Sequence, residues 1–175
     1  MERSMYARRR SSLEEEQLII DKLFAAIVLK KFKLARILAE GGANVSAKLS
    51  SGVTTLMAAC DAVTGDCHLE KKYGLIKCLI KNGAKVNACD MFKRTALHYA
   101  CINGRKETIQ ILEEHGADTF ALDINGKTPY FYLDYNSNNQ KTHVLVRRDS
   151  IATNSIENFF PSLLRWDSRD FLNSL

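Results

Sequence analysis

Three short segments of this chain repeat one pattern, and each closes a stretch in which apolar residues have helical spacing. They are Gly42–Ala47, Gly83–Ala88 and Gly116–Ala121. The last two glycines are 33 residues apart, and the same step separates Lys93 from Gly126 in two further matching boxes. A period of that length predicts a solenoid of helical hairpins, in which each unit buries its apolar face against the next. Such a stack offers a long outer surface, which favours binding over catalysis.

The repeat pattern divides residues 13–146 into four predicted units. These are residues 13–48, 49–88, 89–121 and 122–146. The first keeps both helical segments but lacks the threonine-containing box, as a capping unit does. The second holds eight more residues than the third between its box and its glycine, and the surplus falls within residues 61–70, a predicted surface loop. In the fourth, aromatic residues replace small ones, and we expect them to seal the end of the stack.

The third unit carries the most regular box, Thr95-Ala96-Leu97-His98. Thr95 is suited to cap the helix that follows it, and Gly116 is suited to the left-handed conformation that ends the second helix. With this box and the glycine-alanine boxes, residues 18–135 resemble the ankyrin repeat family. The resemblance implies an all-α solenoid of helix-turn-helix units joined by β-hairpin loops. It also implies that His98 forms hydrogen bonds between repeats and that the chain binds another protein.

Two further segments carry a narrower resemblance. The insertion after the first helix of a middle repeat, within residues 56–80, resembles that of germ-cell proteins that combine ankyrin repeats, a sterile alpha motif and a leucine zipper. Residues 166–175 resemble the first helix of a sterile alpha motif. This resemblance implies a scaffold of the piRNA pathway at germ granules and the mitochondrial surface.

The C-terminal region divides into a polar linker, residues 147–155, and an apolar tail, residues 156–175. An apolar patch of this kind usually marks an interaction. The sequence leaves three alternatives open for the tail: that it folds back on the last repeat, that it binds a partner, or that it begins a further domain. We expect a monomer unless the tail self-associates.

The formal net charge of +5 is concentrated in residues 1–12, which we predict to be a disordered basic leader. The rest of the chain is nearly neutral, which disfavours nucleic acid as a partner of the folded part, because such binding needs a continuous positive surface. The longest strictly apolar run, Leu23 to Leu29, is too short to span a membrane. We expect an intracellular protein, located in the cytoplasm, with a nuclear location left open.

Five cysteines without a Cys-x-x-Cys pair indicate neither a disulfide framework nor a zinc site. Cys60 and Cys101 hold equivalent places after an alanine and are predicted to be small core residues. Cys67 beside His68 is the one pair that suggests metal binding. The sequence lacks the common motifs of hydrolases, metalloproteases and nucleotide-binding enzymes. We therefore predict no catalytic site, no metal and no cofactor.

The predicted binding surface lies on the hairpin loops and the inner helices, which form the fingers and the palm of an ankyrin stack. The finger residues are Leu49, Asp90, Met91, Phe92, Asp123 and Ile124, and the palm residues are Tyr99, Ile102 and Asn103. Met91, Phe92 and Tyr99 are expected to contribute most, because aromatic residues and methionine are enriched in interfaces. The alternative for Phe92 is that it packs only on the neighbouring hairpin.

Two Arg-Arg-x-Ser patterns suggest a second function, that of a kinase-regulated adaptor. Ser11 and Ser12 follow three arginines in the leader, and Ser150 follows Arg147 and Arg148. Phosphorylation adds up to about two negative charges to a serine, so it would cancel much of the positive charge of the leader.

Overall fold

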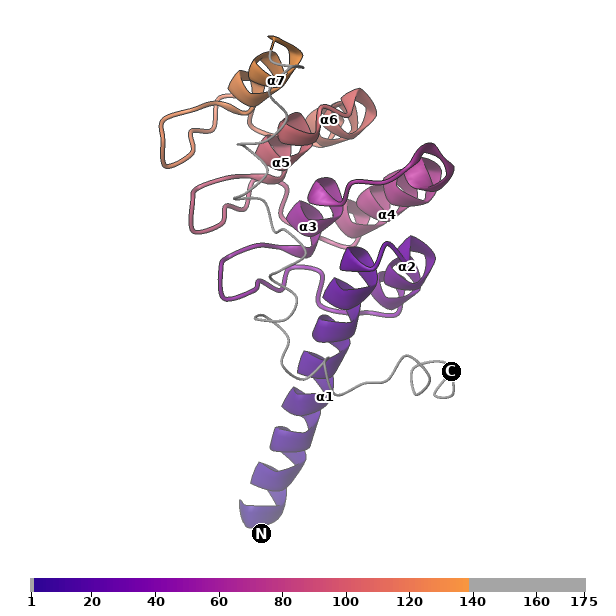
Figure 1. The fold of residues 1–175 in the computed structure, drawn as a ribbon. Coiled ribbons are helices and arrows are strands. Elements are labelled where there is room, and N and C mark those ends of the chain that lie inside the picture. Colours follow the sequence, from indigo (N-terminus) through magenta and orange to yellow (C-terminus); the bar gives the residue numbers. More distant parts are fainter. Residues whose placement is uncertain (1, 139–175) are drawn as a thin grey trace. The chain divides into compact units, whose positions relative to one another are not determined.

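The computed structural model describes residues 2–138, which are mainly helical (Figure 1). The helices are α1 (Glu2–Val28), α2 (Phe32–Glu40), α3 (Thr55–Asp61), the 3-10 turn η1 (Asp66–His68), α4 (Leu69–Lys81), α5 (Ala96–Asn103), α6 (Lys106–Glu114) and α7 (Pro129–Asn138). Within the described residues no β-strand forms, and an isolated bridge joins Lys48 to Thr54. The predicted linker at 147–155 and the predicted tail at 156–175 lie outside the described residues.

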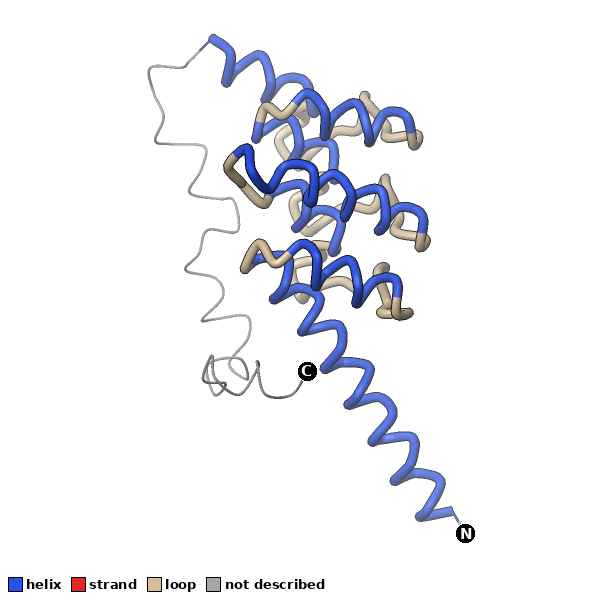
Figure 2. The backbone as a smooth tube through the Cα atoms, turned by 90° about the vertical axis from the view of Figure 1, so that its right-hand side faces the viewer, coloured by secondary structure: helices blue, strands red, loops and turns tan. Residues whose placement is uncertain are grey.

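The helices form consecutive pairs, α1 with α2, α3 with α4, and α5 with α6. The inner helices α1, α3, α5 and α7 pack one against the next, and the outer helices α2, α4 and α6 do the same in a second row (Figure 2). Each inner helix therefore lies beside the inner helix of the following repeat. This arrangement confirms the all-α solenoid that the 33-residue period predicts.

The core of the stack centres on the inner helices α3 and α5, which are buried on nearly all sides. Every residue from 56 to 60 in α3 and from 96 to 101 in α5 is buried. Alanine and cysteine supply many of these positions, which lets the helices approach closely. Burial raises the pKa of both the Cys60 and Cys101 thiols to about 12, so both stay protonated at neutral pH. Their predicted role as small core residues is confirmed.

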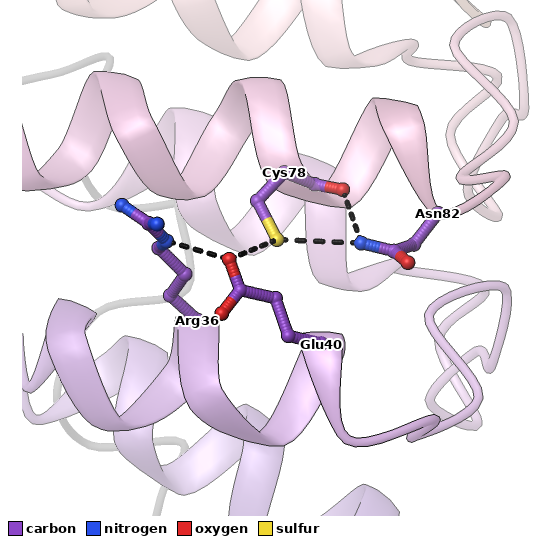
Figure 3. A network of polar contacts seen from close by, with 4 residues as sticks. All are labelled: Arg36, Glu40, Cys78 and Asn82. Carbon is purple, nitrogen blue, oxygen red and sulfur yellow. Dashed lines mark hydrogen bonds and ion pairs between the residues drawn. The ribbon is translucent and has the colours of Figure 1, made fainter.

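A small polar network lies between the outer helices α2 and α4 (Figure 3). The Arg36 guanidinium contacts the Glu40 carboxylate at 2.8 Å, one helical turn away. That carboxylate also accepts a long contact of 3.9 Å from the Cys78 thiol of α4, and the amide of Asn82 donates to the Cys78 carbonyl at 2.8 Å. The polar groups at this helix contact are thus paired locally.

Helix α1 differs from the sequence-based expectation. The predicted disordered leader at 1–12 is helical from Glu2 onward, and the helix continues without a break to Val28. The segment contains neither glycine nor proline and is rich in arginine, glutamate and alanine, all of which favour helix. Among residues 13–28 of α1, the buried positions lie in the last part of the helix and include Leu23, Phe24 and Ile27. Within the described residues no helix is both long and apolar enough to cross a membrane.

The insertion at 61–70 only partly forms the predicted loop. Measured from the glycine that follows each outer helix, α4 begins four residues earlier than α6, so half of the surplus lengthens a helix. The remainder forms a short loop around η1. Lys72 explains why the loop stays close to the core, because its buried ammonium group donates to the carbonyls of Cys60 at 3.0 Å and Ala62 at 2.8 Å. These carbonyls lie at the end of α3, where a helix lacks internal donors.

Comparison of the three hairpin loops reveals backbone strain at Lys93. Lys93 has a φ of 56°, in the left-handed region, whereas the equivalent position is Gly52 in the preceding loop and Gly126 in the following one. A side chain in this conformation costs about 1 kcal/mol because its Cβ approaches the following carbonyl oxygen. The second hairpin loop therefore carries a cost that its neighbours avoid.

We predict that Lys93→Gly raises the free energy of unfolding by about 0.5–1 kcal/mol, because glycine adopts a positive φ without strain. Urea unfolding followed by circular dichroism measures the change. Lys85→Gly is the matched control, since it removes the same charge at a position without a positive φ. The control is expected to lower stability, and an equal gain in both variants would contradict the explanation.

We also predict that Lys72→Met lowers the free energy of unfolding by about 1–2 kcal/mol, because it leaves the Ala62 carbonyl without its donor and removes one of the two donors to the Cys60 carbonyl. Lys71→Met, on the exposed side of the same helix turn, should be nearly neutral. Thermal unfolding of the two variants side by side measures the difference. Equal melting temperatures would mean that the buried ammonium group does not hold the insertion.

Candidate protein-binding surface

The hairpin loops that connect each outer helix to the next inner helix form one continuous row. The backbone N–H of Met91 donates to the carbonyl of Ser51 in the preceding loop at 2.9 Å. One repeat later, the N–H of Ile124 donates to the carbonyl of Phe92 at 2.9 Å. These two bonds occupy equivalent positions and fix each loop tip against its neighbour. The tips therefore present their side chains as an ordered series.

Asp90 holds the turn of the second loop from inside. Its Oδ1 accepts hydrogen bonds from the backbone N–H groups of Phe92 and Arg94, both at 2.8 Å, and its Oδ2 accepts one from the Tyr99 hydroxyl at 2.7 Å. Burial and the contact with Asp90 raise the pKa of Tyr99 far above its ordinary value. Tyr99 is only 2% exposed and Asp90 is also buried. The prediction that these two residues contact a partner is corrected, because their polar groups bind each other within the fold.

Asp123 repeats this arrangement in the third loop. Its Oδ1 accepts from the backbone N–H groups of Asn125 at 2.8 Å and Lys127 at 2.9 Å, and its Oδ2 accepts from the Tyr132 hydroxyl. Burial opposes ionisation here, yet the hydrogen bonds from Tyr132 and the two backbone amides outweigh it and lower the pKa of Asp123. This buried carboxylate is likewise structural, and its prediction as a finger residue is corrected.

The apolar tip residues, in contrast, point to solvent. Met91 is 63% exposed and Ile124 is 61% exposed, although both lie next to a buried aspartate. Phe92 is partly exposed, and the guanidinium of Arg94 lies over its ring at 4.9 Å from the centroid. Leu49, in the first loop, is half-buried. The structure thus brings these four predicted residues into one row of loop tips.

Two further apolar residues of the third loop were missed by the sequence reasoning. Leu122 is exposed, and Phe120 is 83% exposed. Alignment of the repeats contains the signal that could have found them. Phe120 aligns with the polar Asn87 and Leu122 aligns with Cys89, so a large apolar side chain replaces a smaller one at each position. Asn87 bridges to the following repeat through the Gly116 carbonyl at 2.9 Å, a bond that a phenylalanine cannot form. We define the hairpin patch as the exposed or half-buried apolar residues of the turns at 49–53, 90–94 and 122–127, which are Leu49, Met91, Phe92, Leu122 and Ile124. Phe120 precedes the third turn and lies outside this definition.

The predicted palm residues have a mainly structural role. The Asn103 amide donates to the carbonyls of Cys60 at 3.2 Å and Asp61 at 3.1 Å, and so ties α5 to the end of α3. Its amide donor is therefore used within the fold, and its assignment to partner binding stays a prediction. Ile102 and Ala62 are half-buried, as is Asp61, whose pKa is raised by burial. The inner-helix side therefore offers less accessible surface than the loop tips.

His98 connects two repeats, as the resemblance implies. Its Nδ1 accepts a hydrogen bond from the backbone N–H of Thr95 at 3.1 Å, and its Nε2 lies 3.2 Å from the carbonyl of Lys127 in the following repeat. Both contacts are satisfied by a neutral ring that carries its proton on Nε2. The ring also meets Tyr132 edge to face, with centroids 6.3 Å apart. The geometry supports a structural histidine.

The remaining predicted sites are placed as follows. Cys67 and His68 are exposed, with Sγ 2.8 Å from Nδ1, and residues 13–134 show no group of three potential metal ligands. The backbone of Ser11 and Ser12 lies within α1, and Ser150 lies outside the described residues. Phosphorylation at these serines stays a prediction.

The stacked helix pairs, the buried inner helices α3 and α5 and the bonded loop row define a repeat solenoid with an extended outer surface. Comparison with known proteins gives the family. A family model described as ankyrin repeats, in three copies, matches residues 67–152. The chain belongs to the ankyrin repeat family.

Several ankyrin proteins resemble the chain over part of its length. It is 36% identical over 109 residues to ankyrin repeat and SOCS box protein 11 of Danio rerio, a match covering 62% of this chain and 33% of the relative. Mouse Rabankyrin-5 is 33% identical over 95 residues, or 52% of this chain and 8% of the relative. A putative ankyrin repeat protein, FPV244 of fowlpox virus, is 26% identical over 174 residues, or 90% of this chain and 25% of that protein. The matches thus span a third or less of these relatives.

The burial of His98 generates a prediction on pH. Burial lowers its pKa below the ordinary value of 6.5, although the Lys127 carbonyl and the Asp123 charge oppose the shift. The unfolded chain then binds the proton more readily than the folded chain, so stability should be full above pH 6.5 and fall as the pH drops below it. Urea unfolding between pH 7.5 and 5 measures this slope. His98→Gln should flatten it, while His68→Gln, an exposed control, should leave it unchanged.

Proposed function

We propose that this chain is a non-enzymatic interaction module that binds a partner protein through the hairpin patch and acts as a scaffold or adaptor. The proposal rests on one observation, that the acidic residues of the loop tips are buried while the apolar residues beside them are exposed. The acidic residues, Asp90 and Asp123, are turned inward and bonded, whereas their apolar neighbours Met91 and Ile124 are exposed. Exposed apolar residues on rigid supports are where a partner gains binding energy by removing surface from water.

The family supports the coarser part of this proposal, because ankyrin repeats in general mediate protein–protein interaction. The rigidity of the loop row supports the finer part. Bonds between successive loops and within each turn already fix the backbone of the tips, so binding requires little further ordering. Met91 and Phe92 also belong to the residue types that are enriched at interface cores.

A cytoplasmic location forms part of the proposal. A germ-granule scaffold of the piRNA pathway is a narrower version, supported by the insertion between α3 and α4. Immunofluorescence of the endogenous protein in germ cells tests that version, and absence of the protein from perinuclear granules and mitochondria would reject it.

The test of the proposal is a comparison of two surfaces on the same stack. The double variant Met91→Ser with Ile124→Ser makes the hairpin patch more polar. Ile37→Ser is the control on α2, because Ile37 and Met91 are both 63% exposed. The immobilised proteins are incubated with lysate of the native tissue, and bound proteins are quantified by mass spectrometry. We expect a defined set of proteins to bind wild type and Ile37→Ser and to fall at least about tenfold with the double variant, the loss expected for removal of interface anchors.

Circular dichroism and thermal unfolding of each variant show that the fold is intact, as expected for changes at exposed positions. Equal capture by all three proteins would remove the hairpin patch as the binding surface. Loss with Ile37→Ser alone would move the site to the outer helices.

A further inference from the structure

At the turns of the second and third hairpin loops, residues 90–94 and 123–127, the charges are sorted by sign. The two tip aspartates are buried, and each carboxylate accepts three hydrogen bonds from its own repeat. Their negative charge is therefore shielded by amides and a tyrosine hydroxyl rather than presented to a partner. The cations of the same turns, Lys93, Arg94 and Lys127, are exposed or half-buried. The accessible charge at these two turns is positive.

Two of these cations occupy equivalent positions, and each lies on an aromatic ring, although the two rings come from different positions of the repeat. Arg94 and Lys127 are 33 residues apart, and each stands at the end of the turn of its loop. In both cases the ring belongs to a phenylalanine. The Arg94 guanidinium is 4.9 Å from the centroid of Phe92, and the Lys127 ammonium group is 4.2 Å from that of Phe131. Contact with an aromatic face holds a cation in place without neutralising it.

Within residues 13–134 neither cation forms an ion pair, although the charge of Arg94 acts on Asp61 and opposes the rise of its pKa. The ion pairs of residues 13–134 are Arg36 with Glu40 and Arg105 with Asp66, both away from the loop tips. The Nε of Arg94 is also buried without a hydrogen-bond partner. A positioned guanidinium or ammonium group beside exposed apolar side chains matches a carboxylate beside apolar side chains.

We propose that the partner segment bound at the hairpin patch is an extended peptide in which aspartate or glutamate alternates with apolar residues. Its carboxylates lie against Arg94 and Lys127, and its apolar residues lie on Met91, Leu122 and Ile124. The inference rests on the proposed function, since it names the chemistry of the partner for the same surface. It is independent of which protein supplies the segment.

The experiment uses three fluorescein-labelled 16-residue peptides and the full chain. The acidic probe repeats Glu-Leu-Asp-Ser, the neutral probe replaces its acids with Gln and Asn, and the basic probe replaces them with Lys. Fluorescence anisotropy is measured at 50 and 300 mM NaCl. We expect the acidic probe to bind at least about tenfold more tightly than the neutral one at low salt, and to lose most of that advantage at high salt, because exposed charges are screened.

Paired variants locate the charges that matter. Arg94→Gln with Lys127→Gln should bring the affinity for the acidic probe down to that for the neutral probe. Lys33→Gln with Lys77→Gln is the matched control, because it removes the same net charge from exposed positions on α2 and α4 and should leave the affinity nearly unchanged. Lys127→Gln alone, which leaves Arg94 on Phe92, should give an intermediate loss and guards against a folding effect of the double variant.

Four results would overturn the inference. The first two are that the acidic probe does not bind and that the neutral and acidic probes bind equally. The third is that the loop variant and the control variant lose equal affinity for the acidic probe. The fourth is that a 20-nucleotide poly(U) RNA displaces the labelled acidic probe at the same concentration as the unlabelled acidic peptide does. Equal binding of neutral and acidic probes that is lost with Met91→Ser and Ile124→Ser would leave the hairpin patch as a binding surface without acidic preference. The two proposals therefore fail separately.

Discussion

The burial of α5 between its two neighbours is the constraint on which the rest of the structure depends. This helix of eight residues packs against α3 on one side and α7 on the other, and every residue from 96 to 101 is buried. A helix this short is not stable alone in water, so its stability comes from the adjacent repeats. His98 adds a directional bond across the same contact. The loop tips can be an ordered surface only because the inner helices fix where each loop leaves and returns.

Much of this arrangement can be predicted from the sequence, because each repeat needs the same residue types at its helix ends and buried positions, so the same pattern occurs several times. The glycines that end the outer helices, Gly42, Gly83 and Gly116, all have φ near 80–91°, as their common place in the pattern predicts. The two core cysteines and the inter-repeat histidine are also correct. These features depend on backbone geometry and on burial within one unit, both of which a local pattern encodes.

The exposure of the residues proposed for binding was predicted less well, and the reason lies in side-chain direction. Met91 and Asp90 are adjacent in the sequence, yet one is exposed and the other buried. Tyr99 was expected on the surface because an aromatic residue suits an interface, but its hydroxyl finds the buried Asp90 carboxylate nine residues earlier. A sequence gives the residue types of such a pair and not their contact. The insertion shows the same limit, since only Lys72 and its acceptors reveal why it stays near the core.

Comparison of the three loops shows that the aspartate and the tyrosine form one unit. Asp90 pairs with Tyr99 and Asp123 pairs with Tyr132, whereas the first loop has Leu49 and Ala58 at the equivalent places. The backbone turn closes without the carboxylate there, through Leu49 N–H to Val53 O at 2.9 Å.

The pairing follows from the cost of burial. A buried carboxylate without its hydroxyl partner would lose more free energy than the pair contributes, so the two residues are present together or replaced together by apolar ones. The aspartate is therefore not needed to form the turn. What it adds is a loop whose negative charge is held inside, and this leaves Arg94 and Lys127 to set the sign of the surface that a partner meets.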